Sequence, residues 1–473
     1  MQFGTGVLLR GLPDYFIDKA NKRGIFNGRV VVVKSTGGDV AEFEEQDNLF
    51  THCIYGIREG QVVEERVVNA SISRVLSAKD HWNAILRCAH DPQIQAVISN
   101  TTEVGITFVS ESVHAQPPSS FPGKLLAFLL ERYTAFGGDR DRGLVIVPTE
   151  LIPDNGPKLR DILMRLAKEN GLDSDFLSWL TTCNHFCSSL VDRIVPGKLP
   201  PAQKEQIESM LGISDNLMII SEPYCLWAIE SGNDRVKEVL SFFRADDGVH
   251  IVPDITMFRE LKLRLLNGTH TLCCGLAYLA GFDTVRQSME DKDVPVFMSR
   301  LMHEEIIPAI VSDDLSETSA DAFASAVLDR FRNPFIEHRF LSITLQYSSK
   351  MAMRNIPILQ RYVQRFGKIP ECIAIGLAAH ILFLKGTLRD DGKYYGVRGG
   401  QPYAITDDNA AFYAECWTSG NTGSVVTRVL ANEKIWGINL LSIEGLAEKV
   451  NLYLEMLIKD GPAAVIRGRA GKV

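Results

Sequence analysis

The chain has 473 residues, of which 45% are hydrophobic and 23% are charged, and its formal net charge is −8. This length exceeds what one hydrophobic core usually spans, so two domains are expected. The negative charge argues against nucleic acid or an anionic membrane as a partner. No apolar run approaches the ~20 residues that cross a bilayer, and the start MQFGTG lacks the layout of a signal peptide. The nine cysteines are scattered along the chain. This distribution is typical of reduced thiols and not of a disulfide scaffold, so we expect a cytoplasmic protein.

Strand-like and helix-like segments alternate in the first half of the chain. The β-branched run RVVVVKST is typical of a strand buried on both faces. The predicted strands are 29–36, 94–103, 143–150, 217–223 and 249–254, with helical stretches such as 123–136 between them. This alternation predicts an α/β Rossmann-like domain over residues 1–253, whose ligands bind beyond the carboxyl ends of parallel strands.

Helical patterns dominate after about residue 254, and strand patterns become scarce. The predicted helices are 256–282, 298–311, 320–331, 336–365, 370–385 and 443–459. We therefore expect a second, mostly α-helical domain over residues 254–473, which carries the substrate-binding and catalytic side chains.

Two glycines, Gly4 and Gly6, lie between a short apolar start and a helical pattern. A G-x-G at a strand-to-helix turn lets backbone N–H groups approach a pyrophosphate, although an ordinary glycine turn has the same sequence. The second strand ends at Lys34 and the third at Asn100 and Thr102, where the riboses of a dinucleotide would lie. The pattern predicts a dinucleotide site. Because Lys34 would suit a 2′-phosphate better than the usual acidic residue does, the choice between NAD and NADP stays open.

The segment LKLRLLNGTH (261–270) places Lys262, Asn267 and His270 in a run otherwise suited to a buried helix. On an α-helix Lys262 and His270 lie about 80° apart, with Asn267 one turn before His270 but off to one side of Lys262. All three can face one cleft. A lysine in a desolvated pocket can serve as a general acid and base, while asparagine and histidine hold a substrate oxygen. The alternative is a snorkelling lysine, a helix-end asparagine and a core histidine.

The stretch KLRLLNGTH followed by GLAYLAGF resembles the Lys-x4-Asn-x2-His signature of the polyol-specific long-chain dehydrogenases, the mannitol dehydrogenase family. The resemblance covers nearly the whole chain and is strongest to the tagaturonate reductase (altronate oxidoreductase) branch. It rests on stretches such as QFGTGVLLRG, CNHFCSSLVDRIVPG, EPYCLWAIE and RFGKIPECIAIGLAAHILFLKG. It implies that Lys262 is the acid/base, that Asn267 and His270 contact the reacting oxygen, and that NAD is the cofactor, with NADP not excluded.

Further residues carry over from the motifs of this family. Asp192 matches the aspartate of a VDRI motif at the substrate end of the site, with a buried structural pair with Arg193 as the alternative. Gly4 and Gly6 match the phosphate-binding turn, and Arg10 matches an arginine close to it. Asn100 and Thr102 fall on the strand end that approaches the cofactor.

The chain departs from the mannitol dehydrogenases at Leu151, where those enzymes carry an oxyanion asparagine. The departure argues against a mannitol-like oxyanion hole and agrees with the uronate branch. Glu150 beside it either takes a polar role towards the substrate or caps the following helix. The carboxylate of an acid sugar needs a cationic partner. Arg339 and Lys350 lie in the region that lines the substrate cleft of the family, with surface or interdomain ion pairing as the alternative.

The stretch CNHFC contains Cys183, His185 and Cys187, which are residue types that bind zinc. Zinc needs four ligands, or three and a water, and no second ligand cluster follows at a suitable spacing. The resemblance also implies a family without metal. We expect no metal and interpret the stretch as a buried turn before the VDRI strand.

Together these features predict a reversible NAD-dependent reduction of a ketouronate, which the resemblance implies is D-tagaturonate to D-altronate. A fructuronate reductase and a mannitol-type polyol dehydrogenase are the alternatives within the family. A non-catalytic dinucleotide-binding sensor is the alternative of another class; the short first strand favours it, and the Lys–Asn–His set argues against it. The expected partner is a small sugar acid, and the expected state is a monomer or small homo-oligomer.

Overall fold

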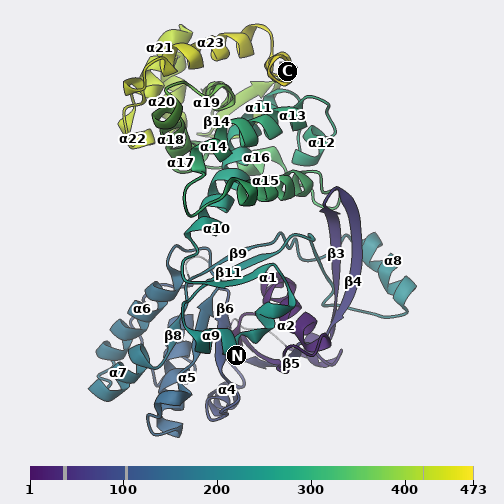
Figure 1. Ribbon diagram of the computed structural model, residues 1–473, viewed down its shortest axis with the longest axis vertical. Coiled ribbons are helices and arrows are strands. Elements are labelled where there is room, and N and C mark those ends of the chain that lie inside the picture. The colour runs from purple at the N-terminus through teal and green to yellow at the C-terminus, as the bar shows by residue number, and fades with distance from the viewer. Residues whose placement is uncertain (36–39, 102–104, 419, 472–473) are drawn as a thin grey trace. The chain divides into compact units, whose positions relative to one another are not determined.

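The computed structural model describes residues 1–35, 40–101, 105–418 and 420–471 (Figure 1). The chain divides into two compact units. The first unit comprises residues 1–55 and 62–256, and the second comprises residues 56–61 and 257–473.

The first unit is built on a six-stranded sheet in the order β5-β2-β1-β6-β7-β8, in which every neighbouring pair is parallel. Counted along the chain, this is the Rossmann order, which reverses between β1 and β6. Ligands of such sheets bind where the order reverses, beyond the carboxyl ends of the strands. The predicted Rossmann-like fold of this part is confirmed. The strands are β1 (Gln2–Phe3), β2 (Val30–Lys34), β5 (Ile72–Ser77), β6 (Ala96–Ser99), β7 (Val145–Pro148) and β8 (His185–Phe186).

Both faces of this sheet are buried, which explains the run of four valines in β2. Successive side chains of a strand point to opposite faces. Val31 and Val33 accordingly pack with helices α4 to α7, whereas Val30 and Val32 pack with α1 and α2. These helices are α1 (Val7–Gly11), α2 (Pro13–Lys22), α4 (Trp82–Cys88), α5 (Phe121–Ala135), α6 (Asn155–Glu169) and α7 (Ser174–Thr182).

Two smaller sheets complete the strands of this half of the chain. One has the order β10-β3-β4 and the other the order β12-β11-β9. The predicted strands near 217–223 and 249–254 therefore exist, but in separate sheets. The ribbon of β3 and β4 (Figure 1) was not predicted, because β4 is largely exposed and lacks an alternating pattern. The elements are β3 (Phe50–Arg58), β4 (Gln61–Asn69), β9 (Ser189–Asp192), β10 (Ile219–Ser221), β11 (Leu226–Glu230) and β12 (Val249–Val252), with helices α3 (Ala41–Glu44), α8 (Pro201–Leu211) and α9 (Asp234–Val239).

The second unit is mostly helical, as predicted. Helix α19 lies at its centre against α11 and α23, and it is apolar on all sides because its whole circumference is buried. Its helices are α10 (Thr256–Glu260), α11 (Thr269–Leu279), α12 (Val285–Met289), α13 (Val294–Arg300), α14 (Ile307–Ile310), α15 (Glu317–Phe331), α16 (Phe340–Ile343), α17 (Tyr347–Arg354), α18 (Ile356–Phe366), α19 (Glu371–Phe383), α20 (Ala410–Trp417), α21 (Thr422–Leu430), α22 (Glu433–Trp436), α23 (Leu446–Lys459) and α24 (Pro462–Ala470). Within the described part of the chain, none of the helices has both the length and the apolarity to cross a bilayer.

The predicted helix over 336–365 is wrong as a single element, because it is divided into α16, α17 and α18. Gln346 adopts a left-handed backbone conformation, and its N–H donates to the Thr406 carbonyl at 2.8 Å. The N–H of Ser348 donates to the Asp407 carboxylate at 2.7 Å. Residues distant in sequence thus end one helix and begin the next. A small antiparallel sheet of β13 (Thr387–Leu388), β14 (Tyr394–Arg398) and β15 (Gln401–Ile405) was also not predicted.

Two predicted helices of this unit contain π-helical segments. The segment Leu261–Gly268 (η3) joins α10 to α11, and Leu301–Ile306 (η4) joins α13 to α14. In a π-helix the N–H groups bond to carbonyls five residues back, and such segments are rare and often lie at functional sites. The first of them contains two of the three predicted catalytic residues.

Candidate active site

The turn after β1 brings two strand ends close together. Gly4 has a φ of +126°, and its N–H donates to the Val33 carbonyl at 3.0 Å. A Cβ at this position would lie 2.9 Å from the carbonyl oxygen of Asn100, at the end of β6. Only glycine fits there. Gly6 caps α1, and a Cβ added to it would meet nothing within 4 Å. A close backbone approach flanked by open space suits a dinucleotide.

The other predicted cofactor residues lie at the carboxyl ends of neighbouring strands. Lys34 is the last residue of β2 and is half-buried. The side-chain amide of Asn100 donates to the carbonyl and hydroxyl oxygens of Thr149, at 3.2 and 3.0 Å, which orients it beside the end of β7. Thr102 lies outside the described residues and stays a prediction.

The carboxylate of Glu150 is hydrogen-bonded to the end of β6 and to Thr101. Its side chain is only 2% exposed. One carboxylate oxygen accepts from the N–H and hydroxyl of Thr101, at 2.8 and 3.0 Å, and the other accepts from the Ser99 hydroxyl at 3.1 Å. It does not cap a helix, since α6 begins at Asn155. The capping alternative is therefore wrong, whereas a polar role of Glu150 towards the substrate stays a prediction.

Arg10, predicted to lie at the phosphate-binding turn, is held by contacts within the first unit. Its buried guanidinium donates to the Leu217 carbonyl and lies 5.4 Å from the ring centroid of Phe50 and 5.9 Å from that of Phe43. Burial lowers the pKa of this guanidinium. These contacts give Arg10 a structural role, and a role at the cofactor stays a prediction.

Asp192 ends strand β9 and is buried. Its neighbour Arg193 donates to the carbonyls of Glu222 and Gly11, at 3.0 and 2.7 Å, and lies over the ring of Tyr15. Arg193 thus anchors the strand to α1 and to the segment after β10. A role of Asp192 at the substrate stays a prediction.

The π-helix changes how Lys262 and Asn267 are oriented to each other. In an α-helix residues five apart are separated by about 140° around the axis. In a π-helix residues five apart lie roughly one turn apart, because that is the spacing of its hydrogen bonds. The π-helix therefore turns Asn267 towards the face that carries Lys262. The assumption of α-helical geometry over 261–268 is corrected, and the prediction that these residues share a face gains support from this change.

Few positions along this helix are accessible. Within 261–278, an entirely described stretch, every residue is buried except Lys262, Leu263, Asn267 and His270, which are partly exposed. We call Lys262, Asn267 and His270 the polar strip. A lysine, an amide and an imidazole at the accessible positions of an otherwise buried helix are not explained by packing of the core.

The environment of His270 keeps its imidazole neutral. Burial is the largest cause, and the nearby side chains of His338, Arg330 and Arg354 act in the same direction, so that the pKa of His270 falls well below its usual value. A neutral imidazole can donate one hydrogen bond and accept another.

Several basic side chains lie beside His270. Of these, only Lys350 was predicted from the sequence to lie near the substrate. Burial and the neighbouring Arg354 lower the pKa of Lys350, and burial and Lys350 lower that of His338. The guanidinium of Arg354 donates to the Thr271 hydroxyl at 3.1 Å, one residue after His270. Lys350 donates to the Ile343 carbonyl at 3.0 Å. We call Arg330, His338, Lys350 and Arg354 the basic cluster; their spacing in the sequence follows no motif that would have revealed it.

Arg339 does not join this cluster. Its side chain is 72% exposed, and its guanidinium pairs with the Glu337 carboxylate at 3.1 Å. The expected substrate contact is corrected to the alternative, a surface ion pair, because a solvated and paired arginine gains little from a ligand.

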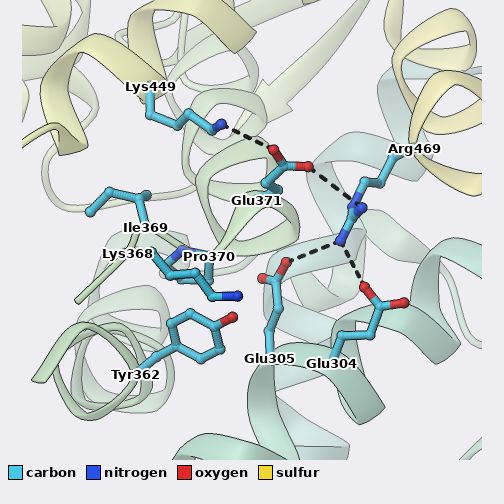
Figure 2. A pocket seen from close by; sticks show the side chains of 9 residues that line it. All are labelled: Glu304, Glu305, Tyr362, Lys368, Ile369, Pro370, Glu371, Lys449 and Arg469. Carbon is cyan, nitrogen blue, oxygen red and sulfur yellow. Dashed lines mark hydrogen bonds and ion pairs between the residues drawn. The ribbon is translucent and has the colours of Figure 1, made fainter. Parts of the chain in front are cut away.

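A separate polar cavity of about 700 Å³ lies in the second unit (Figure 2). Arg469 stands at its centre, at 2.8 Å from Glu304, 3.5 Å from Glu371 and 3.8 Å from Glu305. Lys449 pairs with Glu371 at 3.0 Å. The cavity is lined by equal numbers of acidic and basic side chains, and none of the described candidate residues lines it. We therefore infer that its ion pairs anchor α24. It is lined by Glu304, Glu305, Tyr362, Lys368, Ile369, Pro370, Glu371, Lys449 and Arg469.

The CNHFC stretch leads from α7 through β8 towards β9. Cys183 and Cys187 are buried, and burial raises the pKa of the Cys187 thiol to about 12. All nine cysteines, each within the described residues, are free thiols. Among the described residues no group of three or more His, Cys, Asp or Glu side chains is placed to hold a metal ion.

Known proteins share this chain's sequence and fold over nearly its full length. The mannitol dehydrogenase Rossmann domain matches residues 1–239, and the mannitol dehydrogenase C-terminal domain matches residues 254–458. An altronate oxidoreductase of Halalkalibacterium halodurans is 38% identical, with 99% of this chain and 92% of that protein covered. An altronate oxidoreductase of Bacillus subtilis is 37% identical, with 98% and 93% covered.

Two solved structures have a similar fold at lower identity. A D-sorbitol dehydrogenase in substrate-free form has a TM-score of 0.79 at 20% identity, covering 98% of this chain and 94% of that one. A mannitol 2-dehydrogenase of Pseudomonas fluorescens, solved with NAD and D-mannitol, has a TM-score of 0.66 at 23% identity, covering 100% and 94%. With both domain matches in place, the chain belongs to the mannitol dehydrogenase family and is an oxidoreductase acting on CH–OH groups.

Proposed function

We propose that the chain catalyses the reversible NAD(H)-dependent reduction of a ketouronate, D-tagaturonate, to D-altronate. The observation that carries the proposal is the polar strip. Over residues 261–278 the accessible polar side chains are those of Lys262, Asn267 and His270 and no others. The substrate class is supported by the relatives that are named altronate oxidoreductase.

Each residue of the polar strip has one chemical task in this proposal. During reduction, negative charge develops on the substrate oxygen. Lys262 donates a proton to that oxygen, while the Asn267 amide and the neutral imidazole of His270 donate hydrogen bonds to it. In the oxidation direction, Lys262 in its neutral form accepts the hydroxyl proton. NADH, when bound, supplies the hydride for the keto carbon.

Residues 1–253 would hold the dinucleotide and residues 254–473 the substrate. Gly4 would allow the tight turn and Gly6 would admit the pyrophosphate, because a Cβ at Gly6 would meet nothing within 4 Å. Asn100 and Lys34 would contact the two riboses from the ends of β6 and β2. We propose that the dinucleotide is NAD and not NADP. NAD is the dinucleotide in the solved mannitol 2-dehydrogenase, which has the same fold.

The basic cluster would bind the carboxylate of the sugar acid. Arg354 offers a planar fork that matches a carboxylate, and Lys350 offers a point charge. Both lie close to the polar strip, since Arg354 lowers the pKa of His270 in the strip and Lys350 lowers that of His338 beside it. A neutral polyol would offer these cations no negative charge. Asp192 remains a proposed contact to the sugar.

Leu151 supports the choice of an acid sugar over mannitol. It stands where the mannitol dehydrogenases carry an oxyanion asparagine, and its side chain is 58% exposed. A leucine provides no hydrogen-bond donor for a developing oxyanion. The oxygen of the substrate would then depend on Asn267 and His270.

The test follows the loss of NADH and NADPH absorbance with tagaturonate, fructuronate and fructose in parallel. We expect the highest kcat/KM for tagaturonate with NADH. A preference for fructuronate would reassign the chain to fructuronate reduction, and a preference for fructose to a mannitol-type activity. Tight NADH binding without turnover of any of them would indicate a sensor.

A further inference from the structure

The π-helix that carries Lys262 and Asn267 is bound by a residue far away in the sequence. Asn355 lies between α17 and α18 and is fully buried. Its side-chain amide donates to the carbonyl of Gly268, the last residue of the π-helix, at 3.0 Å. The amide oxygen of Asn355 has no hydrogen-bond partner among the described residues. The donor half of the amide is therefore the half that the structure uses.

Gly268 makes this contact possible because it has no side chain. A Cβ built on Gly268 would lie 3.2 Å from the amide nitrogen of Asn355, which is closer than side chains usually pack. Gly268 has helical backbone angles, so glycine is not required here for a left-handed conformation. It is suited to the position because it lets the Asn355 side chain approach the backbone closely. Asn355 and Gly268 thus form one packed unit.

Further hydrogen bonds link the same two segments. Arg264, buried within the π-helix, donates to the carbonyls of Met353 and Arg354 at the end of α17, each at 2.8 Å. Thr271 donates its hydroxyl to the Asn267 carbonyl at 2.8 Å and accepts from Arg354 at 3.1 Å. Side chains therefore satisfy the carbonyls at the end of the π-helix, where helical bonding is irregular.

The irregular hydrogen bonding matters because it decides where Asn267 points. A return to α-helical bonding over this segment would rotate Asn267 away from the face of Lys262, towards a separation of about 140°. A rare backbone geometry persists only where its surroundings hold it in place. Asn355 provides such a restraint at the residue that directly follows Asn267.

We propose that Asn355 is a positioning residue, which holds the π-helix in the register that sets Asn267 beside Lys262. This inference rests on the proposed roles of Lys262 and Asn267 in the reduction. Asn355 acts through the Gly268 carbonyl and touches neither substrate nor cofactor in this account.

The experiment compares Asn355→Asp and Asn355→Ala with the wild-type chain. An ionised aspartate has the shape of asparagine but cannot donate to the Gly268 carbonyl, whereas a protonated one can. Because burial raises the pKa of a carboxyl group, the aspartate variant regains its donor as the pH falls. We expect kcat at pH 8 to fall about tenfold or more in both variants, with the Kd for NADH unchanged. The ratio of Asn355→Asp to wild-type kcat should rise between about pH 8 and pH 6, and that of Asn355→Ala should not.

Asn421→Ala is the matched control. Asn421 caps α21 in the same unit by accepting from the Ser424 N–H at 3.3 Å, so its loss removes a hydrogen bond without touching the π-helix. Its kcat should stay within about twofold of the wild type. Gly268→Ala, which presses a methyl group against the Asn355 amide, should lower kcat as Asn355→Ala does, and the double variant should be no worse than either single one.

Three outcomes would overturn the inference: a kcat for Asn355→Ala within twofold of the wild type, an equal loss for the aspartate variant at every pH, or additive losses in the double variant. If the wild type does not reduce any sugar acid, the proposed function fails and amide hydrogen exchange over 261–271 still tests the restraint. Exchange there should be faster in Asn355→Ala than in Asn421→Ala, and equal exchange would sink the inference. If the Asn355 variants do not fold, Gly268→Ala is compared with Asn421→Ala by the same measurements.

Discussion

The imidazole of His270 packs against the phenyl ring of Phe331, with the ring centroids 4.2 Å apart and the planes inclined by 43°. The ring of His338 approaches the same imidazole edge-on at 5.1 Å. Aromatic neighbours on two sides restrict the rotation of His270, and burial among cations keeps it neutral. The structure thus holds an uncharged hydrogen-bonding group at a fixed orientation on the polar strip.

The neutral state of His270 has a direct spectroscopic consequence. We expect its imidazole resonances to stay in the neutral form from about pH 8 to pH 6, where an ordinary histidine titrates. They are assigned by their loss in the variant His270→Gln and followed by NMR. In the same variant, loss of the imidazole should lower kcat by about 10–100-fold, since one hydrogen bond to the oxyanion is weakened. A titration midpoint near the ordinary value of 6.5 would contradict the assignment.

Removal of the proton donor should affect turnover and leave cofactor binding intact. We expect Lys262→Ala to lower kcat by about 10²–10⁴-fold, which is the usual contribution of a general acid. Lys262→Arg keeps the positive charge but should not restore the rate, because a guanidinium does not release its proton. NADH affinity, measured by fluorescence titration, should change less than about twofold in both variants. Near-normal reduction by Lys262→Ala would show that another group supplies the proton.

The basic cluster should determine selectivity for acid sugars. Truncation of Arg354 or Lys350 to alanine should raise the KM for tagaturonate by about tenfold, because a charge-assisted hydrogen bond to the carboxylate is lost. In Lys350→Ala, turnover of a ketose without a carboxylate, however slow, should be unaffected. Arg339→Ala is the control, since that arginine is exposed and paired with Glu337. Equal effects on charged and neutral substrates would argue against carboxylate recognition at this cluster.

Acid should destabilise the second unit through His380. This histidine is fully buried beside the rings of Tyr347, Tyr413 and Trp436, and burial lowers its pKa to about 4. The unfolded chain takes up a proton near pH 6.5, before the folded chain does. The contribution to stability is therefore complete above pH 6.5 and is lost as the pH falls from 6.5 towards 4.

The variant His380→Phe isolates this contribution. The free energy of unfolding in urea, measured at several values between about pH 7 and pH 4.5, should depend less steeply on pH than in the wild type. The difference in slope should approach ~1.4 kcal/mol per pH unit at most. Parallel curves for the two proteins would show that His380 does not titrate differently in the folded and unfolded states.

Local patterns in the sequence were sufficient to predict strands β2, β6 and β7 of the parallel sheet. The valine run of β2 indicated a strand buried on both faces, and alternation of its side chains is what distributes Val31 and Val33 to one face and Val30 and Val32 to the other. The G-x-G turn indicated a close backbone approach, and Gly4 has the positive φ and the short contact to Asn100 that require glycine.

Local patterns failed where a side chain is held by a partner that is distant in sequence. The contact of Arg10 with the Leu217 carbonyl and that of Glu150 with Thr101 could not be predicted from the sequence. Basic side chains at positions 330, 338, 350 and 354 meet beside His270 because α15, α17 and the segment before α16 converge there. None of these partners follows from spacing along one element.

The sequence by itself determined that Lys262, Asn267 and His270 lie on one helix, since residue type and periodicity are properties of a single segment. Only the tertiary structure decided that Lys262 and Asn267 turn towards one face, because this requires π-helical bonding over Leu261–Gly268. That bonding is stabilised by hydrogen bonds to the end of α17 and to Asn355, which lies 87 residues further along the chain than Gly268. A pattern within one helix cannot show such a register, because the atoms that stabilise it belong to another.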